Sequence, residues 1–299
     1  MPLVPFQELM SAAEAGGYAV GYFESWSLES LLAVADAAEA TRSPVILGFS
    51  GLYLFEPRRV VHDPLEAYAA MGLEVCRKLS VPTCFIFNES PFLDQVLRAI
   101  DLGFNVVMYS DEELPEAELK AGVREVVAKA HPLGCAVEAE MSAPPGVDGE
   151  LSAAPEELHL TDPAHARAFV EETGVDCLAV NVGQAHLHGR EKVHLRLDLV
   201  EDLRREVPVP LVLHGASSIE RADLAAAIRL GVRKINVGSV LKQRFLSALR
   251  EGCAAVPPDA NPYEALGSGF QQDLLTRGRV AEREVVEELL HLFGSAGKA

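Results

Sequence analysis

The sequence predicts an α/β fold in which eight parallel strands, each followed by a helix, close into a barrel. Short apolar, β-branched runs alternate with longer amphipathic segments along the chain. The runs are continuously apolar, which is typical of parallel strands that are buried on both faces. Eight such units in about 250 residues match a (β/α)8, or TIM, barrel.

The candidate strands are short and rich in Val, Ile, Leu and Phe. An open, doubly wound sheet is the alternative, but its first strand is normally followed by a glycine-rich turn, and Phe23-Glu24-Ser25-Trp26 stands there. The eight strands are Ala19–Phe23, Val45–Phe49, Thr83–Phe87, Asn105–Tyr109, Ala136–Glu140, Cys177–Val182, Pro210–Leu213 and Lys234–Val237.

Segments with helical spacing lie between the strands. Asp162–Thr173 opens with Asp-Pro, a capping residue followed by proline at the first helical position. Asn261–Leu292 is expected to form a C-terminal helical extension that packs on the barrel or on a partner subunit, so residues 1–299 form one domain. The other helices are Ser27–Ala40, Asp63–Leu79, Asp94–Leu102, Glu118–Ala130, Leu197–Glu206, Ile219–Leu230 and Val240–Gly252.

The composition excludes several classes of partner. With 26 basic and 44 acidic residues the net charge is −18, which disfavours binding to nucleic acid or to an anionic membrane. The five cysteines are scattered without a CxxC pair, as expected of buried thiols in a reducing compartment. No signal peptide and no apolar run of membrane-spanning length is visible. We therefore expect a cytoplasmic protein.

Polar residues gather at the carboxyl ends of the predicted strands, where barrel active sites lie. Two histidines and several carboxylates at converging strand ends indicate a divalent metal site, although each residue alone also fits a hydrogen-bonded structural role. Glu138 and Glu140 point the same way, and Glu140, nearer the strand end, is the better ligand candidate. In strand order these residues are Glu24, Ser50, Asn88, Glu89, Ser110, Asp111, Glu138, Glu140, Gln184, His186, His214 and Asn236.

Two turns are candidates for an anion site. His214-Gly215-Ala216-Ser217-Ser218 and Asn236-Val237-Gly238-Ser239 are each followed by a helix. Glycine lets backbone N–H groups approach an anion, and serine adds a hydroxyl donor. The loops after strands seven and eight are a frequent phosphate site in barrels. Ordinary strand-to-helix capping is the alternative interpretation.

A long loop follows the fifth strand. Met141–Pro155 contains Pro144-Pro145-Gly146 and Gly149 and reads as a flexible connection. Long loops at this end of a barrel are candidate lids over the active site.

Several motifs resemble those of the class II, metal-dependent fructose-bisphosphate and tagatose-bisphosphate aldolases. The resemblance runs the length of the chain without a large gap. The motifs are Gly17-Tyr18-Ala19-Val20-Gly21 with Phe23, Ala185-His186, Leu213-His214-Gly215-Ala216-Ser217, Lys234-Ile235-Asn236-Val237 and the C-terminal Leu292–Ala299.

This resemblance implies roles for individual residues. His186 and His214 match histidines that hold a zinc-type ion, and Glu140 matches a carboxylate that is a metal ligand in some relatives. Gly215, Ser217 and Ser239 would bind substrate phosphate, and Asn236 would lie near the sugar hydroxyls. Asp148, in the candidate lid, falls where relatives carry a mobile glutamate and would be a mobile acid/base.

Two positions that carry the chemistry of the family depart from its pattern, and Leu187 and Glu24 differ from it as well. Where the third strand of relatives ends Asp-His-Gly, this chain has Asn88-Glu89-Ser90. The aspartate is the acid/base of the family, and the Asn88 amide cannot transfer a proton. The histidine is a metal ligand, and Glu89 replaces it with a carboxylate that can ligate Zn²⁺, Mn²⁺ or Co²⁺.

Three functions follow as alternatives. The first is a lyase that acts on a phosphorylated ketose or sugar acid, with the metal on His186, His214 and Glu89, Glu140 as a candidate fourth ligand and Ser50 at the substrate site. The second is an isomerase, epimerase or decarboxylase in which Glu89 is a general base. The third is a non-catalytic binder of sugar phosphates. The resemblance and the C-terminal extension suggest a homodimer or homotetramer.

Overall fold

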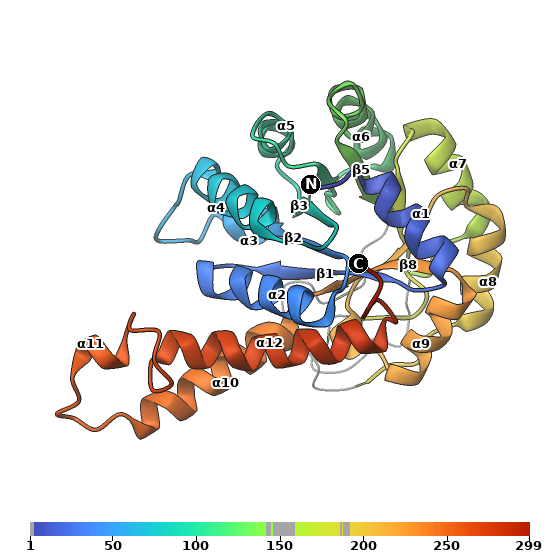
Figure 1. Ribbon diagram of the computed structural model, residues 1–299. Helices are drawn as coiled ribbons and strands as arrows, with labels where there is room; N and C mark the ends of the chain where they lie inside the picture. The colour runs from blue at the N-terminus through green and yellow to red at the C-terminus, as the bar shows by residue number, and fades with distance from the viewer. Residues whose placement is uncertain (1–2, 142–144, 146–158, 186, 188–191) are drawn as a thin grey trace.

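The computed structural model describes residues 3–141, 145, 159–185, 187 and 192–299. Eight strands form a closed barrel in chain order, and neighbouring strands are parallel (Figure 1). The predicted barrel is therefore confirmed. The strands are β1 (Val20–Ser25), β2 (Val45–Ser50), β3 (Thr83–Ser90), β4 (Val106–Tyr109), β5 (Ala136–Glu140), β6 (Cys177–Ala179), β7 (Leu211–Leu213) and β8 (Val232–Val237).

Helices form the outer ring of the barrel (Figure 1). None of the helices in the described part of the chain is long and apolar enough to cross a membrane. The ring contains α2 (Leu28–Thr41), α3 (Gly51–Leu54), α4 (Leu65–Lys78), α5 (Leu93–Asp101), α6 (Glu116–Ala130), η1 (His131–Leu133), α7 (Pro163–Thr173), α8 (Leu197–Glu206), η2 (Ala216–Ser218), α9 (Arg221–Leu230) and α10 (Ser239–Ala255).

Side-chain caps start two of these helices where the sequence predicts them. The Ser27 hydroxyl accepts a hydrogen bond from the Ser30 amide at the start of α2. The Asp162 carboxylate accepts one from the His165 amide, and Pro163 occupies the first position of α7. Each cap satisfies an N–H group that has no partner inside the helix.

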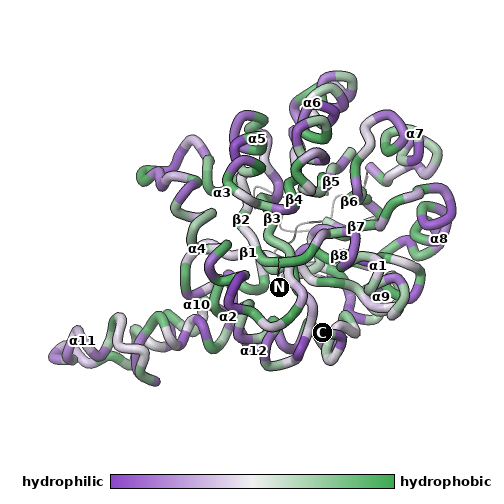
Figure 2. The backbone as a smooth tube through the Cα atoms, turned by 45° about the horizontal axis from the view of Figure 1, so that its top comes forward, coloured by the Kyte–Doolittle hydropathy of each residue, from purple (hydrophilic) through white to green (hydrophobic). Residues whose placement is uncertain are grey.

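The core has two layers separated by the strands. Side chains such as Val20 and Ile46 fill the barrel interior, whereas Phe23 and Leu47 pack between strands and helices. Hydrophobic segments occur in the strands at the centre, and the helices show mixed polarity (Figure 2). Apolar residues on both faces of the strands explain their continuously apolar sequences.

The first helix, α1 (Phe6–Gly16), is not among the predicted helices. Its buried residues Phe6, Leu9, Met10 and Ala13 belong to the same cluster as the barrel interior. The Val4 amide donates to the Thr83 carbonyl at the start of β3. The helix thus closes the amino-terminal end of the barrel, opposite the strand ends that carry the polar residues.

The C-terminal extension contains two helices in place of one long helical region. The helices α11 (Pro262–Ala265) and α12 (Leu274–Leu292) are separated by residues 266–273, and the Asp273 carboxylate caps α12 by accepting from the Leu275 amide. α12 packs against α10 and α2, and α11 lies at the far end of the arm (Figure 1). Packing on the barrel agrees with the prediction.

Candidate active site

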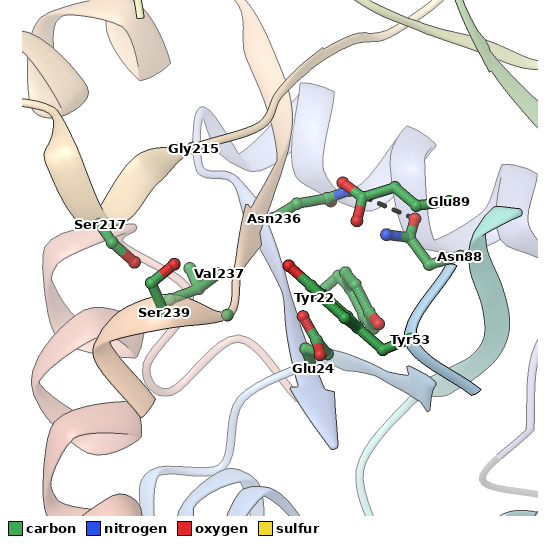
Figure 3. Close-up of a pocket in the computed structure, with 11 residues that line it drawn as sticks. Tyr22, Glu24, Tyr53, Asn88, Glu89, Gly215, Ser217, Asn236, Val237 and Ser239 are labelled. Atoms are coloured by element: carbon green, nitrogen blue, oxygen red, sulfur yellow. Dashed lines mark hydrogen bonds between the residues drawn. The ribbon is translucent and has the colours of Figure 1, made fainter. Parts of the chain in front are cut away.

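A polar pocket opens at the carboxyl ends of the strands (Figure 3). It brings together six residues that the sequence assigns to catalysis or substrate binding: Asn88, Glu89, Gly215, Ser217, Asn236 and Ser239. Tyr22, Glu24, Tyr53, Val237 and Gly238 complete its lining.

His214 lies at the centre of a buried hydrogen-bond network beneath this pocket. Its Nδ1 is 2.6 Å from Oε1 of Glu89, and its Nε2 is 2.9 Å from Oε1 of Glu138. The Asn236 amide nitrogen is 2.7 Å from the same Nε2. Carboxylates on both sides of one imidazole favour the doubly protonated cation, whereas the Asn236 amide can donate to Nε2 only when that nitrogen carries no proton.

Lys234 provides a second buried positive charge. Its ammonium is 2.6 Å from Oε2 of Glu138 and 2.5 Å from Oδ1 of Asn236. Lys234 and Glu138 are both fully buried. Because Lys234 is two residues before Asn236 on β8, both side chains point into the barrel. The Glu138 carboxylate therefore lies between two cations, the Lys234 ammonium and the protonated His214 ring.

Neighbouring charges favour the charged forms of His214 and Glu138, whereas the pKa of the Glu140 carboxyl is raised. Burial alone would lower the pKa of His214, but Glu140, Glu138 and Glu89 raise it to about 10. Burial would raise the pKa of Glu138, but Lys234 and His214 lower it well below its usual range. Burial raises the pKa of Glu140 to about 7 despite the opposing charge of His214.

The donors around His214 suit a divalent cation in their chemistry. Imidazole and carboxylate groups are common ligands of Zn²⁺ and Mn²⁺. Oε1 of Glu140 is buried and has no hydrogen-bond partner among the residues that the structure describes, as an oxygen that faces a cation would be. In the part of the chain that the structure describes, no three His, Cys, Asp or Glu side chains are arranged to hold an ion. The predicted set also needs His186, which lies outside the described residues.

The two predicted anion-binding turns meet at the pocket. Gly215 has φ 66°, a left-handed conformation that favours glycine, and it precedes the short helix η2. The Val240 amide donates to the Ser217 hydroxyl over 3.1 Å, which joins the turn after β7 to the start of α10. Ser239 begins α10, whose amino-terminal end carries partial positive charge. This wall can bind an anionic group.

The opposite side of the pocket is acidic and aromatic. Glu24 pairs with Lys242, whose ammonium lies 4.0 Å from the centre of the Tyr53 ring. A Cβ atom at Gly238 would come within 2.6 Å of Oε2 of Glu24, so the glycine leaves room for this carboxylate. In Figure 3 the Tyr22 and Tyr53 rings lie between Glu24 and the group of Asn88, Glu89 and Asn236.

Comparison with known proteins identifies the family. The family model "Fructose-bisphosphate aldolase class-II" matches residues 4–298. The chain belongs to the class II fructose-bisphosphate aldolase family. It is similar to the YdjI aldolase from Escherichia coli K12, with 31% identity, 99% of each chain covered and a TM-score of 0.79. A fructose-bisphosphate aldolase from Campylobacter jejuni, at 18% identity, shares the fold with a TM-score of 0.76 over 99% of this chain and 97% of that chain.

This aldolase-family protein carries its two unusual residues at a distorted strand end. Glu89 has φ 44°, a conformation that non-glycine residues seldom adopt. The register between β3 and β4 shifts between Phe87 and Ser90, which accommodates the distortion. The backbone thereby directs Glu89 toward His214, while the Asn236 amide donates to Oδ1 of Asn88 over 3.4 Å.

Other predicted site residues are not all in the pocket lining. Ser50 is a buried neighbour of Asn88 in the sheet, and its hydroxyl has no hydrogen-bond partner within the described part of the chain. Asp148 and His186 lie outside the described residues, as does most of the candidate lid Met141–Pro155. Gln184 is occupied with the backbone of Val180 and Val182, so its role is local.

The sequence interpretation missed Tyr22, Tyr53 and Lys234 as site residues. Side chains two residues apart on a strand point to the same face, so Tyr22 could have been predicted from Glu24, and Lys234 from Asn236. Tyr53 lies on the short helix after β2, and no comparable periodic signal marks it.

Proposed function

We propose that this family member is a metal-dependent, aldolase-type lyase that cleaves or forms a carbon–carbon bond in a phosphorylated ketose or sugar acid. The observation that carries the proposal is the buried His214, held between two carboxylates, in contact with Asn236 of a pocket whose wall is an anion-binding turn. Family membership supports the aldolase-type reaction.

The substrate phosphate would bind at Gly215, Ser217 and Ser239. Backbone N–H groups, hydroxyls and the positive end of α10 would recognise an anion there, and the Lys192 ammonium, which donates to the Ser217 carbonyl over 2.8 Å, adds positive charge beside the turn. Such an anchor fixes the reacting carbons relative to His214 and Asn236, which lowers the entropic part of the barrier. Asn236 and Ser50 would orient the sugar hydroxyls.

A divalent ion, with Zn²⁺ the first choice and Mn²⁺ or Co²⁺ as alternatives, would be held by His186, His214 and Glu89, with Glu140 as a fourth ligand. When bound, such an ion polarises a ketone oxygen and stabilises the enediolate charge. The oxygen Oε1 of Glu140, buried without a hydrogen-bond partner among the described residues, supports a site for a cation, and binding of the ion would release the proton that His214 otherwise carries.

Proton transfer would use residues other than Asn88, whose amide can only orient the substrate. In cleavage, a base removes the proton of the hydroxyl next to the breaking bond, and the bonding electrons move onto the ketone to give an enediolate and an aldehyde. Asp148 is the proposed mobile acid/base for this step. In condensation the same proton returns to the new hydroxyl.

Elemental analysis of protein purified without chelator tests the metal proposal. We expect one equivalent of a divalent metal, and loss of it in a His186→Ala/His214→Ala variant. The matched control is His194→Ala, because His194 lies at the surface and pairs with Asp223. Metal bound only by an Asn88→Asp/Glu89→His variant would show that the native site does not hold an ion, and would favour a sugar-phosphate-binding protein.

A second candidate is an isomerase, epimerase or decarboxylase that forms the same type of enolate. The amide at Asn88 and the position of Glu89 beside His214 favour it, because Glu89 is then available as a general base. Glu89→Gln would keep the metal and lose turnover in this case. Loss of metal in the same variant would favour Glu89 as a ligand.

We further propose that the protein forms a homodimer or homotetramer. Apolar side chains are exposed on the C-terminal arm at Tyr263, Leu266 and Phe270. Sedimentation analysis of the protein and of a Phe270→Glu variant tests this proposal, and a monomeric native protein would contradict it.

A further inference from the structure

Tyr22 presents an unused hydrogen-bond donor to the pocket. Its side chain is 2% exposed and lines the pocket, and its hydroxyl has no hydrogen-bond partner among the described residues. A buried hydroxyl without a partner costs about 1–3 kcal/mol, so its presence calls for an explanation. Phenylalanine would fill the same space without that cost.

The position of Tyr22 is set by the barrel. Tyr22 is the register partner of Asn236, and both side chains face the barrel interior. The Lys234 ammonium lies 5.3 Å from the centre of the Tyr22 ring, within the range of a cation–π contact. The Tyr22 ring is therefore held over Lys234, and the residue lies among the pocket residues drawn in Figure 3.

The neighbouring amide donor of Asn236 is already engaged. The Asn236 amide nitrogen contacts His214, and lies 3.4 Å from both Asn88 and Glu138. The Ser217 hydroxyl accepts from the Val240 amide and keeps its own O–H for the proposed phosphate site on the other side of the pocket. Because Glu24 and Glu89 make this part of the pocket acidic, an oxygen that gains negative charge here needs a donor.

We propose that the phenolic hydroxyl of Tyr22 donates a hydrogen bond to the substrate oxygen on which the enediolate charge develops, which makes Tyr22 a catalytic residue. This inference rests on the proposed function and adds a residue to it. A fixed donor that faces developing charge stabilises the transition state more than the ground state.

The surroundings keep Tyr22 a donor throughout the useful pH range. Burial raises its pKa well above the usual value, and the charges of Glu24, Glu89 and Glu138 raise it further. The hydroxyl thus stays protonated, and its contribution consists of hydrogen bonding without transfer of the proton.

Tyr22→Phe tests the inference, because it removes one oxygen and keeps the ring over Lys234. The probes are dihydroxyacetone phosphate, whose C–H exchange in D₂O reports enediolate formation by NMR, and phosphoglycolohydroxamate, a mimic of the enediolate, whose binding is measured by calorimetry. We expect exchange to slow by about 10²–10³-fold. Hydroxamate affinity should fall by about 10–100-fold, as for loss of one charge-assisted hydrogen bond.

The matched control is Tyr18→Phe, which makes the same chemical change at a buried tyrosine outside the pocket lining. Metal content and affinity for inorganic phosphate should stay at native values in both variants. Loss of either in Tyr22→Phe would assign Tyr22 a structural role and overturn the inference.

Two further outcomes separate the inference from the function on which it rests. If the native protein catalyses exchange and Tyr22→Phe matches it, the inference alone fails. If the metal-loaded native protein neither catalyses exchange nor binds the hydroxamate, the lyase proposal fails and the role of Tyr22 falls with it.

Discussion

Glu138 shows how a buried charge is tolerated in the barrel interior. It is fully buried, yet its two oxygens contact His214 and Lys234, and its pKa is lowered although burial opposes this. Both cations are also buried. A buried ion pair contributes little to net stability, but a single member left alone is strongly destabilising.

Replacing Glu138 with glutamine should therefore destabilise the fold. The change leaves the Lys234 ammonium without its carboxylate, and we expect the free energy of unfolding to fall by about 3–5 kcal/mol. Urea denaturation of the native protein and the variant measures this difference in the free energy of unfolding. Glu201→Gln, at an exposed position on α8, is the control and should change stability by less than about 0.5 kcal/mol. Equal stability of the two variants would contradict a charged Glu138.

Strand alternation predicts which residues face the interior, but not which of them touch. It places Glu138, Glu140 and Asn236 on the inner face, and all three are buried there. The sequence favours Glu140 as the functional carboxylate because it lies nearer the strand end, whereas Glu138 makes the hydrogen bond to His214. The stagger between β5 and β7 decides this, and it depends on the closure of the whole barrel. The distorted backbone at Glu89 is equally invisible in the sequence.

At the scale of elements, the contact of α12 with the barrel contains an unusual residue. Glu282 is fully buried, and neither of its carboxylate oxygens has a hydrogen-bond partner in the described ranges of the chain. Burial raises its pKa to about 9, the nearby charge of Glu24 adds to this, and Lys242 opposes it. In the folded protein Glu282 is therefore neutral near pH 7, whereas it is ionised in the unfolded chain.

This difference makes the stability depend on pH. A folded-state pKa above the unfolded value gives stability that is complete below about pH 4.5 and is lost as pH rises toward 9. Between pH 6 and pH 8, Glu282 should lower the free energy of unfolding by about 1–3 kcal/mol. Glu282→Gln should remove this decline, and denaturation at several pH values measures it. Glu284→Gln, exposed on the same helix, should keep the native profile; a decline that persists in Glu282→Gln would contradict the assignment.

Helices were predictable where caps and periodicity agree. Ser27 and Asp162 start α2 and α7 as expected, because their side chains satisfy orphan amides. A strand–helix repeat gives no reason to expect a helix before β1, so the sequence pattern does not predict α1, although Phe6, Leu9, Met10 and Ala13 have helical spacing. The break at residues 266–273 follows from Gly267 and Gly269, which have positive φ angles.

At the scale of the whole molecule, the barrel separates stability from function. The carboxyl ends of the strands carry the pocket, with its charged and unpartnered polar atoms, and the amino ends are closed by the apolar face of α1. Strained and polar sites cost free energy that must be offset elsewhere in the fold. Burial at the closed end is one contribution that offsets it.

Shortening a buried side chain at the amino-terminal end of the barrel, which α1 closes, should therefore reduce stability without altering the pocket. Phe6 is 2% exposed against the barrel interior, and Phe6→Ala should lower the free energy of unfolding by about 3–5 kcal/mol. Leu133→Ala is the control, because Leu133 is 63% exposed and should lose less than about 0.5 kcal/mol. In both variants, measured where they remain folded, metal content and hydroxamate affinity should match the native protein. Weaker hydroxamate binding by folded Phe6→Ala would mean that packing at one end of the barrel sets the geometry of Tyr22 and His214 at the other, so that the two ends are coupled.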